Sequence, residues 1–135
     1  MECKQLTDKL SVRGQITPED MAAIKAQGFD TIICNRPDGE GADQPCAADI
    51  EAAAKEAGIS FHYNPMEQGG VSPEAVQKQG ELLIDNDGKV LAYCGSGKRA
   101  TVLWALSNPH DLDAEERVKR AAEAGHDISM LRPHL

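Results

Sequence analysis

The 135-residue chain has few aromatic residues and fewer basic than acidic side chains. Aromatic residues make up 4% of the chain, too few for a platform on which nucleic-acid bases could stack. Its 14 lysines and arginines against 22 acids give a formal net charge of −8, which opposes long-range attraction to nucleic acids and anionic membranes. We therefore expect no nucleic-acid partner and no membrane partner. The net charge does not forbid a small anion site, because local cations and N–H groups set the field there.

Long apolar runs are also missing. The longest run is about six residues, far short of a membrane span. The N-terminal residues have no apolar core and no signal-peptide layout, which favours the cytoplasm.

Metal and disulfide motifs are absent as well. The four cysteines contain no C-x-x-C pair and have no ligand-like spacing with the four histidines. We expect no metal, no other cofactor and no disulfide framework. The cysteines are Cys3, Cys34, Cys46 and Cys94.

Strand and helix patterns alternate along the chain, and its length suits one domain over residues 1–135. Short apolar and β-branched runs predict strands at 10–13, 31–35, 59–63 and 90–93. Capping residues, prolines and glycines predict helices at 18–27, 44–57 (capped by Asp43), 73–86, 101–107 and 114–124. This order predicts an α/β fold with a mostly parallel central sheet flanked by helices.

The most informative segment is residues 89–106. There an apolar strand ends in Cys94, and a loop of Gly95, Ser96, Gly97, Lys98 and Arg99 leads into a helix. Such a loop forms a cradle of main-chain N–H groups, which together with two cations favours the thiolate form of a cysteine. We therefore expect Cys94 to be a nucleophile and the loop to bind an anion. The alternative is an inert, buried cysteine in an ordinary strand–helix turn.

Residues 94–99 resemble the active loops of the cysteine phosphatase and rhodanese families. The wider chain is similar to the phosphatase-like domain of the beta-lactamase hydrolase-like proteins, a group also described as sulfur transferases. Residues 16–20, 35–40 (Asn-Arg-Pro-Asp-Gly-Glu), 93–99 and 103–106 carry the resemblance. It implies a dual-specificity-phosphatase-like α/β fold, with Cys94 and Arg99 as the catalytic pair.

Departures from these families bear on the mechanism. Four residues separate Cys94 from Arg99, as in rhodaneses, whereas protein tyrosine phosphatases have five. Tyr93 and Ala100 replace the histidine and the hydroxyl residue that usually flank the phosphatase loop, while Gly95 stands where rhodaneses often have arginine. A phosphatase also needs a general acid, for which the loop after the third strand offers only the weak candidate Glu67.

The end of the second predicted strand adds further candidates, because carboxyl ends of parallel strands meet at one edge of a sheet. Arg36 could brace the Cys94 loop or meet an anionic substrate, with Asp38 orienting it; the alternative is a salt bridge within the turn. Cys34 could resolve an oxidised or persulfidated Cys94, although a buried strand cysteine is the more common situation.

Three functions remain open. The preferred hypothesis is a sulfurtransferase that carries sulfane sulfur as a Cys94 persulfide, a reaction that needs no general acid. The first alternative is a phosphomonoester phosphatase with a phosphocysteine intermediate, and the second is a non-catalytic module that senses anions or persulfides. The expected substrate is a small sulfur-containing or phosphorylated anion, and a persulfide-pathway protein is an expected partner.

Overall fold

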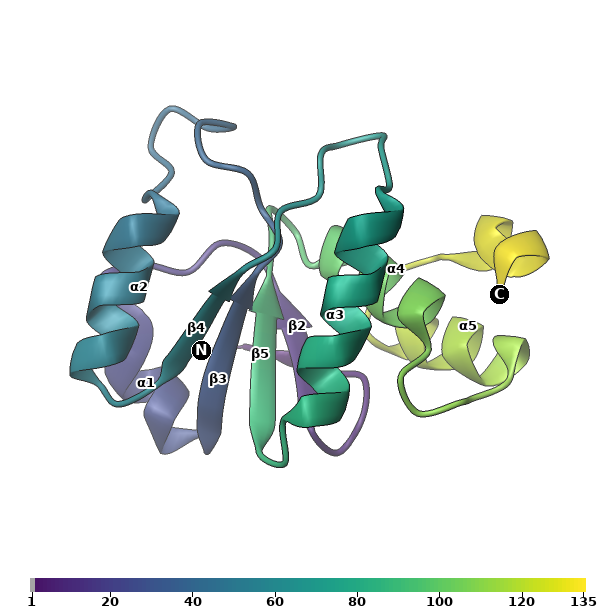
Figure 1. Ribbon diagram of the computed structural model, residues 1–135, viewed down its shortest axis with the longest axis horizontal. Coiled ribbons are helices and arrows are strands. Elements are labelled where there is room, and N and C mark those ends of the chain that lie inside the picture. The colour runs from purple at the N-terminus through teal and green to yellow at the C-terminus, as the bar shows by residue number, and fades with distance from the viewer. Residues whose placement is uncertain (1) are drawn as a thin grey trace.

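The computed structural model describes residues 2–135, which form one five-stranded sheet with helices on both faces (Figure 1). The strand order is β1-β2-β5-β3-β4. β1 pairs antiparallel with β2 and the other neighbours are parallel, so the expected mostly parallel α/β fold is confirmed. The strands are β1 (Lys4–Gln5), β2 (Leu10–Arg13), β3 (Phe29–Cys34), β4 (Ser60–Tyr63) and β5 (Lys89–Tyr93).

Helices cover the two faces of the sheet in separate groups (Figure 1). On one face lie α1 (Met21–Ala26), which follows a 3-10 turn at Pro18–Asp20, and α2 (Ala47–Glu56). On the other lie α3 (Pro73–Asp85), α4 (Lys98–Ser107) and α5 (Ala114–Glu123), and a 3-10 turn at Ser129–His134 ends the chain. Within residues 2–135, every helix is too short or too polar to cross a bilayer.

Side-chain caps start α3 and α5 where the sequence places them. The Ser72 hydroxyl accepts a hydrogen bond from the Ala75 N–H, and the Asp113 carboxylate accepts one from the Glu116 N–H. Pro73 occupies the first helical position of α3, where its missing N–H costs nothing.

The predicted start of α2 is wrong by three residues. α2 begins at Ala47 instead of Gln44, and Asp38 rather than Asp43 accepts a hydrogen bond from the Ala47 N–H, at 2.8 Å. Pro45 disfavours helical backbone at Gln44. The Gln44 side chain is instead bonded to the loop before it, as acceptor for the Glu40 and Gly41 N–H groups and donor to the Pro37 carbonyl.

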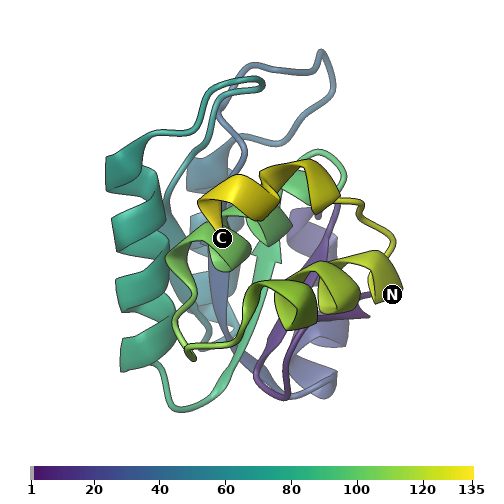
Figure 2. The ribbon, with the colours of Figure 1, turned by 90° about the vertical axis from the view of Figure 1, so that its right-hand side faces the viewer.

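A buried amide network fixes the loops that follow β3 and β4. Gln79, on α3, accepts from the side-chain nitrogens of Asn35 and Asn64, each at 2.9 Å, and donates to the Asn35 side-chain oxygen at 3.0 Å. Figure 2 shows these two loops extending beyond the same end of the sheet. Since Cys94 follows β5 at this end, the network holds in place the segments that surround it.

Candidate active site

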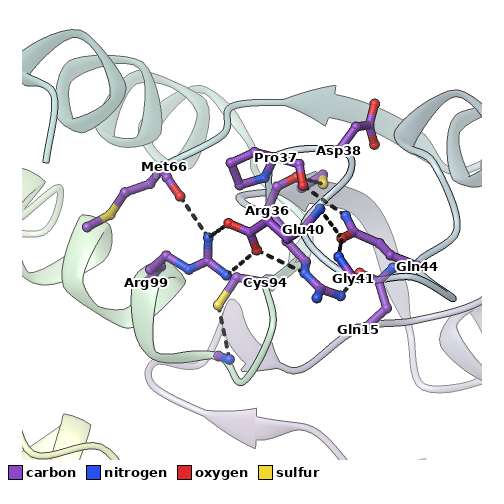
Figure 3. Close-up of polar contacts among 12 residues, drawn as sticks. Gln15, Arg36, Pro37, Asp38, Glu40, Gly41, Gln44, Met66, Cys94 and Arg99 are labelled. Atoms are coloured by element: carbon purple, nitrogen blue, oxygen red, sulfur yellow. Dashed lines mark hydrogen bonds and ion pairs between the residues drawn. The ribbon is translucent and has the colours of Figure 1, made fainter. Parts of the chain in front are cut away.

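Cys94 lies between the end of β5 and the first turn of α4, with its side chain fully buried. The Gly97 N–H donates to the Cys94 Sγ at 3.1 Å (Figure 3). Gly97 has φ 98°, a left-handed conformation that lets the backbone turn into the helix. Among residues 2–135, the N–H groups of Gly95 and Ser96 donate to no protein atom, so they are available to a ligand.

The loop is packed tightly against the chain that follows β2. A Cβ atom built on Gly14 would lie 2.9 Å from the Gly95 carbonyl oxygen, closer than real Cβ contacts allow. Because both contacting groups belong to the main chain, neither can move away without shifting the loop.

Gly14→Ala is therefore expected to destabilise the fold by about 1–3 kcal/mol, the usual cost of overpacking, and to lower any activity of the loop. Chemical denaturation of the purified variant measures the loss. Gly70→Ala is the matched control, since nothing lies within 4 Å of a Cβ built there. Equal stability of the two variants would contradict the tight approach of Gly14 to the loop.

Arg99, in the first turn of α4, is held beside the loop by Glu40 and by the chain after β4. Its Nη1 and Nη2 donate to the two carboxylate oxygens of Glu40 at 2.7 and 2.8 Å, and Nη1 also donates to the Met66 carbonyl at 2.9 Å (Figure 3). A Cβ atom on Gly95 would lie 3.2 Å from Nη2, so a side chain there would crowd the guanidinium. The hydrogen bonds to Glu40 raise the pKa of Arg99.

Arg36 reaches the same carboxylate from the other side. Its Nε donates to Glu40 at 3.1 Å and its Nη1 donates to the Gln15 side-chain oxygen at 2.9 Å. Hydrogen bonds from the two guanidinium groups lower the pKa of Glu40 and keep it ionised, and the bond from Arg99 has the larger effect. Arg36 thus supports the loop through Glu40. Glu40 was not among the predicted site residues; the one sequence feature that marks it is its place at the end of the 35–40 segment.

Two predicted site residues lie elsewhere. Asp38 does not orient Arg36: its carboxylate caps α2, and its N–H donates to the Tyr63 hydroxyl at 3.1 Å. The loop turns between Asp38 and Glu40, so the later acid faces the arginines. Glu67 is exposed on the loop after β4, and the hollow beside Arg99 is lined by the next two residues instead of by Glu67.

That hollow has a volume of about 310 Å³. Its lining includes the two cations Lys98 and Arg99, which suits a small anion. Within the described residues no cluster of three potential metal ligands occurs. The lining residues are Gln68, Gly69, Gly95, Ser96, Lys98 and Arg99.

Cys34 and Cys94 face opposite sides of the sheet. Cys34 pairs in register with Tyr93, and both pack in the core under α1 and α2, whereas Cys94 packs in the core under α3 to α5. The Cys34 thiol donates to the Arg36 carbonyl, and burial raises its pKa. A disulfide between the two would need both Cβ atoms directed at each other, so this arrangement does not support a resolving role for Cys34.

Solved structures share the fold. A candidate phosphatase from Neisseria meningitidis Z2491 aligns over 96% of this chain and 92% of its own, with 32% identity and a TM-score of 0.83. The catalytic core of the PP-IP phosphatase SIW14 from S. cerevisiae aligns over 90% of this chain and 75% of its own, with 12% identity and a TM-score of 0.68. The phosphatase-like fold expected from the sequence is confirmed.

Sequence comparison places the chain in a family. A beta-lactamase hydrolase-like protein from Xylella fastidiosa (strain Temecula1) is 31% identical over 111 residues, which cover 82% of this chain. The match spans 26% of that relative, so the chain corresponds to about a quarter of its length. The sequence model of the family 'Beta-lactamase hydrolase-like protein, phosphatase-like domain' matches residues 2–110. The chain therefore belongs to this family of phosphatase-like domains.

Proposed function

We propose that the chain is a cysteine-dependent phosphatase acting on small phosphate monoesters. The observation that carries the proposal is the placement of the Cys94 sulfur at the start of α4, where a main-chain N–H reaches it and the Arg99 guanidinium is held beside the same loop. The family match and the 32% identical candidate phosphatase support it.

In this reaction the Cys94 thiolate attacks phosphorus. A sulfur–phosphorus bond forms while the ester oxygen leaves with its electron pair and takes a proton from water. A water molecule then attacks phosphorus, the sulfur–phosphorus bond breaks, and phosphate departs while Cys94 returns to its thiolate form. In this proposal the N–H groups of Gly95 and Ser96, which line the hollow together with Arg99, stabilise the charge on the transferred oxygens.

The leaving group limits the substrate. Glu40 is an ionised carboxylate between two arginines and cannot donate a proton, and Glu67 does not line the hollow. Without a well-placed acid, esters whose leaving oxygen is already stable as an anion are favoured. We therefore expect aryl phosphates to be turned over faster than alkyl phosphates.

Sulfur transfer is a second candidate because the Cys94–Arg99 loop is one residue shorter than the phosphatase loop and the Gly97 N–H contacts the sulfur itself. With thiosulfate as donor, the thiolate would attack the outer sulfur, sulfite would leave with the electron pair, and a persulfide would remain on Cys94. A thiol acceptor would then take that sulfur. This route needs no general acid.

One pair of assays separates the candidates. Wild-type protein and Cys94→Ser are given p-nitrophenyl phosphate in one arm and thiosulfate in the other. We expect nitrophenol release that falls at least ~10³-fold in Cys94→Ser, as for loss of a nucleophile. No turnover combined with a one-sulfur mass increase on wild type alone would replace the phosphatase proposal by sulfur transfer. If neither nitrophenol nor the persulfide forms, both enzyme candidates are excluded and the non-catalytic anion-binding module is the function left.

A further inference from the structure

Glu40 lies at the centre of the polar contacts around the loop (Figure 3). One carboxylate oxygen accepts from Arg36 Nε at 3.1 Å and from Arg99 Nη2 at 2.8 Å, and the other accepts from Arg99 Nη1 at 2.7 Å. The side chain is 15% exposed, and that of Arg99 is 11% exposed. A shielded, bidentate arginine–carboxylate pair of this kind fixes both position and angle of the guanidinium.

The main chain of Glu40 is also fixed by hydrogen bonds. Its N–H donates to the Gln44 side-chain oxygen at 3.1 Å, and Gln44 donates to the Pro37 carbonyl at 2.9 Å, which closes the loop on itself. On the other side, Gln15 holds Arg36. The carboxylate is therefore anchored through both its main chain and its ion-pair partner.

The hydrogen bonds of Arg99 show which edge of its guanidinium is available to bind a ligand. A guanidinium has five N–H donors. Both Nη1 hydrogens are used, by Glu40 and the Met66 carbonyl, and one Nη2 hydrogen is used by Glu40. Among residues 2–135, the Nε–H and the second Nη2 hydrogen donate to no protein oxygen, and the guanidinium lies close enough to interact with the Cys94 side chain. These two hydrogens form the side-on fork that matches two oxygens of a tetrahedral anion bound next to Cys94.

We propose that Glu40 is a positioning residue, which takes the end-on edge of Arg99 and thereby turns the side-on edge to the substrate anion. This inference rests on the proposed phosphatase function. It assigns Arg36 and Gln15 to the support of Glu40 rather than to substrate.

The test compares Glu40→Gln with wild type. A neutral amide presents one acceptor in place of two charged ones, so Arg99 loses its fixed angle. We expect kcat/KM for p-nitrophenyl phosphate to fall about 10- to 100-fold, as for a misplaced catalytic group. Asp43→Asn is the matched control, since it removes the same charge from the same loop at an exposed position, and its activity should stay within about twofold of wild type because surface changes have small effects.

A binding readout accompanies the kinetics. Inorganic tungstate, a tetrahedral dianion, should bind wild type in a calorimetric titration, and Glu40→Gln should bind it roughly tenfold more weakly. Arg36→Gln, which leaves the Glu40–Arg99 pair intact, should give a smaller shift in the same direction and covers the case in which Glu40→Gln does not fold. Wild-type turnover and tungstate binding with an unchanged or more active Glu40→Gln would overturn the inference alone. Absent turnover and absent tungstate binding in wild type would overturn the proposed function.

Discussion

Arg99→Lys is expected to lower kcat/KM for p-nitrophenyl phosphate by at least ~100-fold, the usual cost of removing a donor to a developing oxyanion. Lysine keeps the charge but is a point donor with three rotatable hydrogens, so it cannot pair with both Glu40 oxygens, reach the Met66 carbonyl and present a second edge to substrate. The loss should appear in kcat as well as in KM, because a guanidinium with a fixed angle fits the three equatorial oxygens of the transferring phosphoryl group better in the transition state than in the bound ester.

A second arginine–glutamate pair serves as a control for the general effect of replacing arginine by lysine. Arg132 makes a similar two-contact pair with Glu115, at 2.8 and 3.3 Å, but the pair is on the surface near the C-terminus. Arg132→Lys should retain wild-type kinetics. If Arg99→Lys kept more than about half of the activity, the guanidinium would not be the oxyanion donor that the proposal requires.

Regular elements of this fold are predictable from sequence because their signals are local. Ser72 followed by Pro73, and Asp113 followed by two acids, start α3 and α5 where expected. Each capping bond spans three residues, so the residues that make it are visible together in the sequence. The position of Cys94 between β5 and α4 follows from the same kind of signal.

The support of the loop is not predictable in this way. Arg99 and Glu40 are 59 residues apart in the chain, and an acid in a glycine-containing loop is most often solvated. Nothing in the sequence distinguishes Asp38 from Glu40 as a partner for an arginine, since both acids lie in the short loop that follows Arg36. Only the path of the loop, set by the Gln44 side chain and by the Asp38 cap on α2, decides which acid meets the arginines.

Gln79→Leu is expected to cost about 3–5 kcal/mol of stability, from the cost of leaving several buried polar groups without partners. The Gln79 amide is fully buried and bonded to the amides of both Asn35 and Asn64. Leucine fills a similar volume but accepts no hydrogen bond, so each asparagine loses a partner where water cannot replace it.

Gln79→Leu should also disturb the loop that contains Cys94 and so lower activity. Asn35 precedes the segment that carries Glu40, and Asn64 precedes the one whose Met66 carbonyl holds Arg99. We therefore expect lower kcat/KM even under conditions where the variant is folded, together with the loss of stability in urea unfolding. Gln77→Leu is the control on the same helix: its amide is exposed and bonds Glu81, so its effect should stay within about 0.5 kcal/mol. A Gln79→Leu protein as stable as that control would show that the amide network does not hold the two loops.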